Sequence, residues 1–487
     1  MYGKGRSMAG VAAIILAAGK GKRMRSALPK VAHPVAGRPM LWHALQAARG
    51  AGIREIVVVL GHGREALHGT VKPFGAKVAV QESPRGTGDA AGCGLAAVSR
   101  GAGEVVVLCG DAPLIRPATI RALLSARRRR KAAASVLTGI LPDPSGYGRV
   151  LRNPDGTVSR IVEERDGGAQ IRKVREVNSG AYAFDRKFLA RNLPRLSDVN
   201  IQREYYLTDL VFQALQEGKT VVPVAASDPD EVRGINSRAE LARASEILGR
   251  RKVEALLDAG VTIVAPDRVH IDPEVAVGPD SVIEPGVVLL GSTRVGRGVR
   301  IQTGCVVENC RLDDGATLKP YCVLTDSRVR KGAVLGPFAH LRPEADIGED
   351  ARIGNFVEVK KSRFGKGSKA NHLAYIGDAT VGRKANIGAG TITCNYDGLA
   401  KHRTVIGDGV FVGSDTQFVA PVTIGKGALI GAGATITRDV PPFALALSRA
   451  EQKVIEGWVI RRMPELLKKA GIKVPPGKEK GPGKEKT

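Results

Sequence analysis

The sequence predicts two folds in one chain: an α/β domain built on a mostly parallel sheet, followed by an all-β parallel helix of hexapeptide repeats. Short aliphatic runs alternate with helical patterns from residue 11 to 236, whereas a six-residue aliphatic repeat dominates after residue 260. Gly supplies 60 of the 487 residues and aromatic residues only 4%, which favours turn-rich repeats over packed helices in part of the chain.

Six aliphatic runs in the first half are predicted to be buried strands. They are VAAIIL (11–16), EIVVVL (55–60), KVAVQ (77–81), EVVVLCGD (104–111), ASVLTGI (134–140) and VVPVAA (221–226). Segments between them, such as PMLWHALQAARGAG (39–52) and PATIRALLSARRRR (117–130), repeat apolar residues at helical spacing. Ligands of parallel sheets bind at the carboxyl ends of strands, so we expect binding loops after Leu16, Gln81 and Leu108.

A connecting helix is predicted over residues 237–259, where Ser237 and Glu240 have the spacing of a capping box. The predicted organisation is an α/β domain at 11–236, this linker helix at 237–259, a hexapeptide-repeat domain at 260–447 and a partly disordered C-terminal tail at 448–487. The first seven residues are left out of the fold, because Met1 and Met8 are both candidate starts.

The repeat region has two long stretches with aliphatic residues every six positions. The first contains Val277, Ile283, Leu289, Val295, Ile301 and Val307, and the second contains Ile406, Val412, Phe418, Ile424, Ile430 and Ile436. This period suits a parallel β-helix, in which each short strand contributes one inward side chain. The spacing shortens to five at 324–329, 359–364 and 376–381 and breaks at TCNYDGLAKHRT (393–404), which we expect to be a functional loop outside the coil.

Basic residues are in excess, with 74 Lys and Arg against 48 Asp and Glu and a net charge of +26. The charge is concentrated at ARRRRK (126–131) and in KVPPGKEKGPGKEKT (473–487), and neither segment interleaves aromatic residues for base stacking. We expect a solvated basic surface and no nucleic-acid partner. A basic nucleic-acid-binding protein is the alternative, which salt-dependent retention of the isolated tail on RNA would support.

Cysteine usage and hydropathy predict a cytoplasmic protein. The six cysteines include no CxxC pair, and we expect the nearest two, Cys305 and Cys310, to be buried thiols and not a metal or redox pair. No run has the length and apolar character of a signal peptide or membrane span. The histidines lack HxxH and HExxH spacing, so a zinc site is not expected.

Three loops of the α/β half suggest a nucleotide site. LAAGKGKRMRSALPK (16–30) combines glycines with Lys20, Lys22, Arg23, Arg25 and Lys30, although it matches neither GxxxxGK[ST] nor GxGxxG and is a weak signal alone. QESPRGTGDA (81–90) places Gln81 at a strand end before a Gly-Thr-Gly turn, which suits an amide that reads a base edge. LCGDAPL (108–114) places Asp111 after an apolar strand, where a carboxylate is costly unless it pairs or holds a cation.

These segments occur in the order of the sugar-nucleotide pyrophosphorylase motifs. LAAGKGKRM, LPK, GTG and GDAPL are followed by YGR (147–149), IVEE (161–164), EVNSG (176–180) and GIN (234–236). With the hexapeptides and GTITCNYDG, VGSDTQ and EGW, the chain from about residue 11 to 458 resembles the bacterial bifunctional UDP-N-acetylglucosamine pyrophosphorylase/glucosamine-1-phosphate N-acetyltransferase.

The resemblance implies a Rossmann-like nucleotidyltransferase domain, a left-handed β-helix and a homotrimer. It also implies two reactions: acetyl-CoA acetylates glucosamine 1-phosphate in the C-terminal domain, and the N-terminal domain then transfers uridylyl from UTP to N-acetylglucosamine 1-phosphate and releases pyrophosphate. The product would supply peptidoglycan and lipopolysaccharide synthesis. The alternative is a nucleotidylyltransferase whose β-helix is a non-catalytic scaffold, and thiol release from acetyl-CoA distinguishes the two.

The resemblance assigns roles in the first domain. It places the nucleotide at Leu16, Ala17, Ala18, Gly19, Gln81, Gly86 and Thr87, the N-acetylglucosamine part at Gly148, Glu163 and Asn178, the phosphates at Arg23 and Lys30, and Mg²⁺ at Asp111 and Asn236. Metal and cations then offset the repulsion between two phosphate groups, and no side-chain nucleophile is required. Asp89 departs from the family, which more often has His there, and we expect its carboxylate to weaken nucleotide binding slightly unless it points away.

In the repeat domain the resemblance makes His372 the general base of acetyl transfer, a role that suits the ordinary histidine pKa of about 6.5. It places the sugar phosphate at Arg342, Lys360, Tyr375 and Asn386, and acetyl-CoA at Ala389, Asn395, Tyr396, Ser414, Ala432 and Arg449. A single coil presents a convex wall, so we expect neighbouring subunits to complete the cleft.

Overall fold

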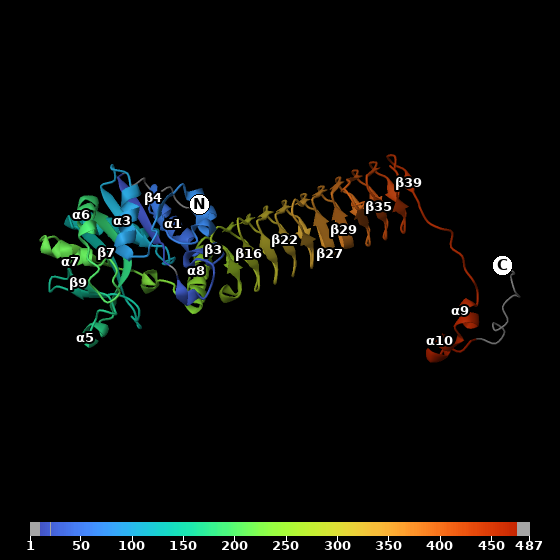
Figure 1. Cartoon of the computed structure of the whole chain (residues 1–487). Coiled ribbons are helices and arrows are strands. Elements are labelled where there is room, and N and C mark those ends of the chain that lie inside the picture. The colour runs from blue at the N-terminus through green and yellow to red at the C-terminus, as the bar shows by residue number, and fades with distance from the viewer. Residues whose placement is uncertain (1–9, 20, 475–487) are drawn as a thin grey trace. The chain divides into compact units, whose positions relative to one another are not determined.

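The structure is a computed structural model that describes residues 10–19 and 21–474 (Figure 1). Contacts divide it into two compact units, Met1–Gly332 and Ala333–Thr487. The N-terminal extension, Lys20 and most of the lysine-rich tail lie outside the described residues, so the disorder expected in the tail stays a prediction. The boundary between the two units falls among the repeats. The domain limits predicted at residues 236, 259 and 447 rest on changes of sequence pattern, and they stay predictions.

The first unit contains an α/β sheet with the strand order β11-β7-β10-β6-β1-β4-β5. The six predicted runs form β1 (Val11–Ala17), β4 (Glu55–Leu60), β5 (Lys77–Val80), β6 (Glu104–Cys109), β7 (Ala134–Ile140) and β11 (Val221–Ala225). β1 pairs in parallel with β4 and β6, as β4 does with β5 and β7 with β11. The prediction of a mostly parallel sheet is confirmed.

One central strand was not predicted. β10 (Glu176–Asp185) lies between β6 and β7 and runs antiparallel to both. Its first half, EVNSG, is polar and contains a register shift after Asn178, so its aliphatic signal is too short to indicate a strand. β8 (Arg149–Arg152) and β9 (Val158–Val162) form a hairpin that joins β10 at its start.

Helices pack on both faces of this sheet (Figure 1). One core joins α1 (Met40–Gly50) and α4 (Pro117–Arg130) to the face that contains Ile15. The other joins α3 (Thr87–Ala97), α6 (Arg186–Asn192) and α7 (Asp209–Gln216) to the face that contains Ile14. Successive side chains of a strand point to opposite faces, so β1 contributes to both cores. The shorter elements are β2 (Pro34–Val35), β3 (Arg38–Pro39), α2 (His68–Val71) and α5 (Ala169–Arg172).

The expectation of six buried strands is wrong for two of them. β5 and β11 lie at the two ends of the strand order, where a strand has only one neighbour. Lys77 and Val78 of β5 are exposed, and the middle of β11 is only partly buried. Aliphatic composition alone does not distinguish an edge strand from a central one.

The predicted connecting helix is α8 (Arg238–Asp258). The Oγ of Ser237 accepts from the backbone N–H of Glu240 at 3.3 Å, and the Glu240 carboxylate accepts from the backbone N–H of Ser237 at 3.0 Å. This confirms the capping box. Ala244 and Ile247 of α8 pack in a small core that also contains Met24, so this helix is part of the first unit and not a free linker.

The first unit continues into short parallel strands. They are β12 (Thr262–Ile263), β13 (His270–Ile271), β14 (Ala276–Val277), β15 (Val282–Ile283), β16 (Val288–Leu290), β17 (Arg294–Val295), β18 (Arg300–Ile301), β19 (Val306–Glu308), β20 (Arg311–Leu312), β21 (Thr317–Leu318), β22 (Val323–Thr325) and β23 (Arg328–Val329). Partners are eighteen residues apart, as in His270 with Val288, or seventeen, as in Arg300 with Thr317. Each coil therefore holds three hexapeptides, one of them sometimes shortened.

The second unit repeats this pattern. Its strands are β24 (Val334–Leu335), β25 (His340–Leu341), β26 (Asp346–Ile347), β27 (Arg352–Lys360), β28 (Arg363–Phe364), β29 (Lys369–Gly377), β30 (Ala379–Val381), β31 (Asn386–Ile387), β32 (Ile392–Cys394), β33 (Thr404–Ile406), β34 (Phe411–Val412), β35 (Gln417–Val419), β36 (Val422–Ile424), β37 (Leu429–Ile430), β38 (Thr435–Ile436) and β39 (Leu445–Ala446). Asn386 pairs with Phe411, twenty-five residues on, because residues 393–404 add a loop to that coil. The chain continues to α9 (Trp458–Arg462) and α10 (Pro464–Lys469).

Burial confirms the repeat prediction. The residues predicted at six-residue spacing are buried, except Val277, which is only partly covered. The strands are parallel, as expected for a β-helix of hexapeptide repeats, and the pattern is consistent with the left-handed form. Cys305 and Cys310 are buried thiols, as predicted.

Part of the basic run after residue 126 is used within the protein. Arg127 donates to Glu104 through Nε at 2.8 Å, and Arg128 donates to the same carboxylate at 2.6 Å. The run forms the last turn of α4, where positive charge favours the negative end of the helix dipole. Within the residues that the structure describes, no helix combines the length and apolar character needed to cross a bilayer.

Candidate active sites

Lys30 contacts both residues predicted to hold a metal. Its Nζ forms an ion pair with Oδ2 of Asp111 and lies 3.1 Å from Oδ1 of Asn236. Asp111 follows β6, and Asn236 directly precedes α8 and its cap. The backbone N–H of Ile235 donates to the Asp111 carbonyl at 2.9 Å, and this bond fixes the GIN loop beside the end of β6.

The oxygens of Asp111 and Asn236 therefore converge on a position that suits a cation, since the Lys30 ammonium lies against both. One carboxylate and one amide are too few for a cage made of protein alone. No group of three or more His, Cys, Asp or Glu with metal-binding geometry occurs within residues 10–19 and 21–474. The pair fits a divalent ion that takes its other ligands from phosphates and water.

The predicted nucleotide loop begins at the centre of the sheet. Leu16 and Ala17 end β1 between β4 and β6, and the Leu16 carbonyl accepts from the backbone N–H of Gly110 at 2.8 Å. A Cβ added at Gly61, the residue directly after β4, would lie 2.8 Å from the Ala18 carbonyl oxygen, so this close approach requires a glycine. The loop thus leaves the sheet where three strand ends meet.

The next part of the loop passes over Lys30. Gly19 is exposed, with open space around its Cα. Gly21 has φ +58, and a Cβ there would lie 2.5 Å from Cβ of Lys30. This contact requires glycine and places the loop against the lysine that reaches Asp111. Arg23 is exposed on the short helix that follows.

The Gly-Thr-Gly turn packs against residues 205–207. Gly86 has φ +108, and a Cβ there would lie 2.6 Å from the Tyr205 carbonyl oxygen. Thr87 begins α3, and its Oγ1 accepts from the backbone N–H of Leu207 at 3.0 Å. Gln81, at 6% exposure, donates through Nε2 to the Gly86 carbonyl at 3.2 Å and to Asp89 at 2.7 Å.

The three residues predicted to hold the sugar also lie close together. The Gly148 carbonyl accepts from the backbone N–H of Asn178 at 2.9 Å. A Cβ added at Gly148 would lie 3.4 Å from both carboxylate oxygens of Glu163, and Thr208 donates to Glu163 at 3.2 Å. Burial raises the pKa of Glu163. This arrangement offers backbone groups, an amide and a carboxylate to a polar ligand.

In the second unit, four predicted residues occupy one position in successive coils. The register of the flanking strand pairs aligns His372 with Ala389, Ala389 with Ser414, and Ser414 with Ala432. We call these four residues the corner column. A Cβ added at Gly413 would lie 2.4 Å from the backbone N of Ala432, so the coils are in close contact beside the column.

Arg449 lies at the C-terminal end of the corner column. A Cβ added at Gly431 would lie 3.5 Å from Nη2 of Arg449, and one at Gly433 would lie 3.8 Å from its Cδ. Asn386 begins β31, three residues before Ala389. The column is thus bounded by a basic group at one end and an imidazole at the other, with small side chains between them.

His372 has a hydrogen-bond partner in the preceding coil. Its Nδ1 lies 2.7 Å from Oδ1 of Asn355, and the two residues are paired in register between β27 and β29. When the amide oxygen accepts, Nδ1 carries the proton and Nε2 keeps its lone pair. The neutral imidazole can then accept a proton at Nε2.

The two basic residues predicted to bind the sugar phosphate each lie near a carboxylate. Arg342 donates to Glu358 at 2.9 Å, and Nζ of Lys360 lies 3.9 Å from Asp378. The hydrogen bond to Glu358 raises the pKa of Arg342. A Cβ added at Gly377 would lie 2.4 Å from the hydroxyl of Tyr375, so this phenol lies over β29 near its end. Both cations and the phenol belong to the coils that hold His372 and its neighbours.

The loop at 393–404 adds polar groups to this region. Asn395 is buried and donates to Asp378 at 2.5 Å, whereas Tyr396 is exposed. Tyr396 forms an isolated bridge with Lys401, and the neighbouring Lys360 ammonium lowers the pKa of Lys401. Two ammonium groups close together suit a phosphate.

Sequence reasoning missed Asn355 and Lys401. Asn355 lies seventeen residues before His372, which is one short coil, so the repeat length was a signal that could have found it. Lys401 lies in the loop, where the six-residue period gives no register. Its position beside Lys360 depends on the path of the loop.

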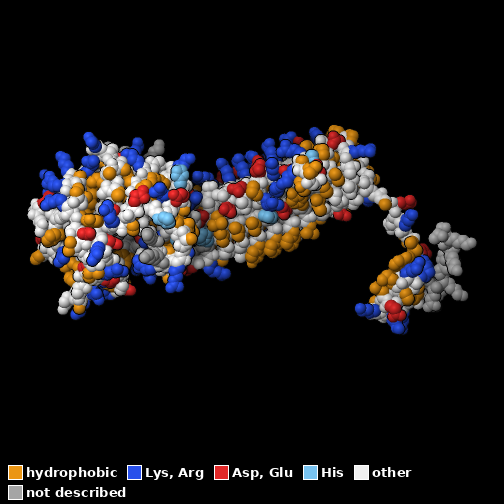
Figure 2. Space-filling view, viewed as in Figure 1, with side chains coloured by type: hydrophobic (Ala, Val, Ile, Leu, Met, Phe, Trp, Pro, Cys, Tyr) orange, Lys and Arg blue, Asp and Glu red, His pale blue; other side chains and the backbone are white. Residues whose placement is uncertain are grey.

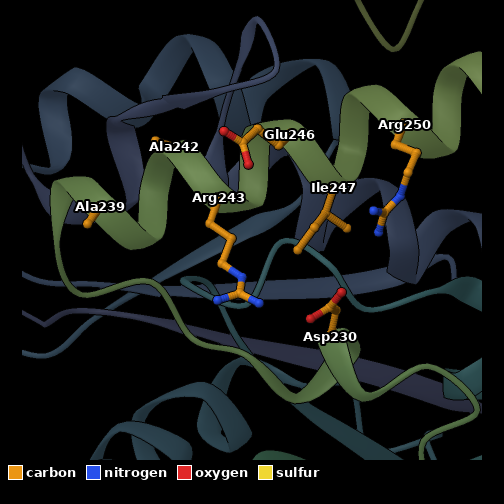
Figure 3. A pocket seen from close by; sticks show the side chains of 7 residues that line it. All are labelled: Asp230, Ala239, Ala242, Arg243, Glu246, Ile247 and Arg250. Atoms are coloured by element: carbon orange, nitrogen blue, oxygen red, sulfur yellow. The ribbon is translucent and has the colours of Figure 1, made fainter. Parts of the chain in front are cut away.

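A hollow of about 570 Å³ lies between α8 and the short segment that contains Asp230 (Figure 3). Arg243, Glu246 and Arg250 of α8 line it together with Asp230, which already accepts from Arg233 at 2.7 Å. Its charges are balanced, and none of the predicted site residues lines it. We assign it no role.

Comparisons with known proteins agree with the two-part architecture. The family described as MobA-like NTP transferase domain matches residues 13–155, and the family described as bacterial transferase hexapeptide (six repeats) matches residues 403–438. Curated relatives extend over both parts. "Bifunctional protein GlmU" of Pelobacter propionicus is 50% identical over 455 residues, which cover 93% of this chain and 99% of that protein.

Proteins of the same name from two other organisms are nearly as similar. The Trichlorobacter lovleyi protein is 48% identical, with 93% of this chain and 99% of that protein covered. The Geotalea uraniireducens protein is 47% identical, with 93% of this chain and 100% of that protein covered. Identity of this level over nearly the whole length of both chains includes the α/β part and the repeats, and the chain therefore belongs to the bifunctional GlmU family.

Proposed function

We propose that this chain synthesises UDP-N-acetylglucosamine by two reactions at two sites. The repeat domain acetylates glucosamine 1-phosphate with acetyl-CoA, and the α/β domain transfers uridylyl from UTP to the product. Membership of the bifunctional GlmU family supports both activities. The observation that carries the proposal is the alignment of His372 with Ala389, Ser414 and Ala432 along one corner of the coil.

In the acetyl step, Nε2 of His372 takes a proton from the amine of glucosamine 1-phosphate. The amine nitrogen attacks the thioester carbonyl, the C–S bond breaks, and CoA leaves as the thiol after the imidazolium of His372 gives its proton to the sulfur. Asn355 holds Nδ1 at 2.7 Å and thereby orients the base. Arg342 and Lys360 bind the sugar phosphate in place of Glu358 and Asp378, and Lys401 adds a further positive charge.

The predicted acetyl-CoA residues fit an extended ligand. The alanines and the serine of the corner column leave room for the pantetheine arm to lie along the coil, and Arg449 at its end suits the CoA phosphates. Asn395 and Tyr396 belong to the loop that leaves the coil after β32, the strand that follows Ala389. Tyr375 and Asn386 then position the sugar.

In the uridylyl step, a phosphate oxygen of N-acetylglucosamine 1-phosphate attacks the α-phosphorus of UTP, and pyrophosphate leaves. Lys30 and Arg23 bind phosphate oxygens, while Gln81, Gly86 and Thr87 hold the uridine. Gly148, Glu163 and Asn178 hold the N-acetylglucosamine. A divalent ion, which we propose is Mg²⁺, would be held by Asp111 and Asn236 and would offset phosphate charge.

We further propose that the protein is a cytoplasmic homotrimer that supplies cell-wall precursors. His372, Ser414 and Ala432 of the corner column are exposed on the outside of the coil. Phe338, Phe356 and Leu373 are exposed beside it, and the two phenylalanine rings stack with centroids 5.3 Å apart. Hydrophobic side chains gather along one edge of the repeats (Figure 2). Such a surface suits burial against another chain.

Product analysis tests the two activities together. The full chain is mixed with glucosamine 1-phosphate, acetyl-CoA, UTP and Mg²⁺, and we expect free CoA thiol, pyrophosphate and UDP-N-acetylglucosamine. If the repeats were only a scaffold, N-acetylglucosamine 1-phosphate with UTP would give product, but acetyl-CoA would release no thiol. Absence of pyrophosphate with N-acetylglucosamine 1-phosphate would reject the uridylyl site.

A further inference from the structure

Asp89 contacts Gln81, the side chain that we propose reads the nucleotide base. Its Oδ2 accepts from Nε2 of Gln81 at 2.7 Å, and its Oδ1 accepts from Nη2 of Arg85 at 2.7 Å. Asp89 lies in the first turn of α3, yet no side-chain hydrogen bond caps that helix. Its carboxylate is therefore directed to Gln81 and Arg85 and does not serve as a cap.

The hydrogen bond to Asp89 determines which atom of the Gln81 amide, Nε2 or Oε1, can contact a ligand. Nε2 has two hydrogens, and it donates to two acceptors, the Gly86 carbonyl at 3.2 Å and Asp89 at 2.7 Å. Because both partners are acceptors, the amide cannot reverse without placing its own oxygen against them. No described residue donates to Oε1 of Gln81, so this oxygen is the group the amide offers to a ligand.

An acceptor at this position distinguishes the pyrimidines. Uracil has an N3–H donor at the centre of its pairing edge, whereas N3 of cytosine is an acceptor. An oxygen directed at N3 therefore bonds uracil and is repelled by cytosine. We propose that Asp89 is a positioning residue that locks Gln81 with its oxygen toward the base and so selects UTP over CTP.

Arg85 and the surrounding packing keep this carboxylate in place. Arg85 pairs with Asp89, and its guanidinium lies 5.9 Å from the centroid of the Tyr205 ring. Tyr205 in turn donates its backbone N–H to the Arg85 carbonyl at 2.8 Å and accepts from Gly88 at 2.7 Å. The carboxylate expected to weaken nucleotide binding is thus already paired within the protein.

The inference rests on the proposed uridylyl activity, and its test separates the two. Wild type, Asp89→Ala and Asp89→Asn are assayed as full chains with N-acetylglucosamine 1-phosphate and Mg²⁺, and kcat/KM is measured for UTP and for CTP. Binding of each nucleotide with Mg²⁺ is measured by calorimetry. Glu65→Ala is the control, because Glu65 is an exposed acid outside the site.

We expect Asp89→Ala to lower the UTP-to-CTP ratio of kcat/KM roughly tenfold, the value of one charge-assisted hydrogen bond. The change should appear mainly in KM and in the dissociation constants. Asp89→Asn keeps one acceptor and should fall between wild type and Asp89→Ala. Acetyl transfer and the Glu65→Ala ratio should not change.

Three results would overturn the proposal. The first is an unchanged ratio in Asp89→Ala, including an equal loss with both nucleotides, which would indicate a structural role. The second is tighter binding of both nucleotides in the variants, which would indicate simple charge repulsion. The third is a wild type that uses CTP as well as UTP. A wild type that neither binds nor turns over UTP would instead reject the proposed function, before any variant is compared.

Discussion

Nδ1 of His372 lies 2.7 Å from Oδ1 of Asn355, the residue at the same position one coil earlier. A coil that repeats every seventeen residues thus brings the proposed base and its proposed positioning group together from neighbouring turns. The hydrogen bond selects the tautomer with a free Nε2, which is the form a general base requires. This pair gives the first two predictions.

Replacing His372 with Ala should lower acetyl turnover roughly 10²–10⁴-fold, the usual contribution of a positioned general base. The apparent affinity for acetyl-CoA should change little, because the rest of the corner column and Arg449 remain. Uridylyl transfer from supplied N-acetylglucosamine 1-phosphate should persist. A thiol-release assay near neutral pH checks this, and turnover within about threefold of wild type would assign the proton to another acceptor.

Asn355→Ala should lower kcat of acetyl transfer less than His372→Ala does, because the base remains and only its orientation is lost. A purely structural role would lower stability without changing the pH profile. We therefore expect the acidic limb of the kcat–pH profile to move in Asn355→Ala, and Asn355→Asp to move it to higher pH, since a carboxylate beside the imidazole stabilises its protonated form. Identical profiles in all three proteins would contradict the positioning role.

The sequence predicted the two folds because each has its own period. The six aliphatic runs predicted to be strands are strands in the structure. The residues spaced by six are buried in the coils, except Val277, which is partly covered. β10 was not predicted because its start is polar. The edge positions of β5 and β11 were not predicted because the sequence of one strand does not say which strands pair with it. Strand order is a long-range property, whereas period is a local one.

The sites were predictable to a different extent. The resemblance in motif order indicated Lys30, Asp111 and Asn236 as site residues. Their spacing in the sequence does not predict that the Lys30 ammonium contacts an oxygen of both Asp111 and Asn236. For Asp89 the sequence predicted only a slight weakening of nucleotide binding, and its bond to Gln81 depends on how α3 starts relative to β5. Lys401 depends on a loop outside the repeat. Contacts between elements depend on the three-dimensional fold, which a local sequence pattern does not specify.

His43 should make the first unit sensitive to acid. Its ring is 7% exposed, its Nε2 lies 2.8 Å from the Val35 carbonyl, and burial lowers its pKa to about 4. The unfolded chain takes a proton near pH 6.5 and the native ring does not, so this contribution is complete above about pH 6.5 and declines as pH falls toward 4. The loss approaches about 3 kcal/mol.

Urea unfolding of wild type and His43→Gln at pH 7, 5.5 and 4 measures this contribution. The variant has no imidazole to protonate, so its free energy of unfolding should fall less over the same range, even if it is less stable at pH 7. The difference between the two proteins isolates His43 from other acid-sensitive groups such as His33, whose pKa is also lowered by burial. Parallel curves would exclude His43 as the cause.

Asp111→Asn and Asn236→Ala should abolish uridylyl transfer and leave acetyl transfer nearly intact. Both changes would weaken the proposed cation position of the first site, where these side chains converge on Lys30. Pyrophosphate release and thiol release measured on the same preparations separate the two activities. Comparable loss of both in a folded variant would contradict the two-site proposal.

The exposed apolar residues beside the corner column give the last prediction. Phe356 is 57% exposed with φ +55, an uncommon conformation for a bulky side chain, and its ring stacks on Phe338. In a homotrimer this surface is covered, so Phe356→Asp should place a charge in the interface, reduce the mass measured by light scattering and lower acetyl turnover. Uridylyl transfer should persist, and Val264→Asp, a change at another exposed residue of the repeats, should leave mass and both activities unchanged. A wild-type monomer with full acetyl activity would refute the trimer, because every group needed for the reaction would then come from one chain.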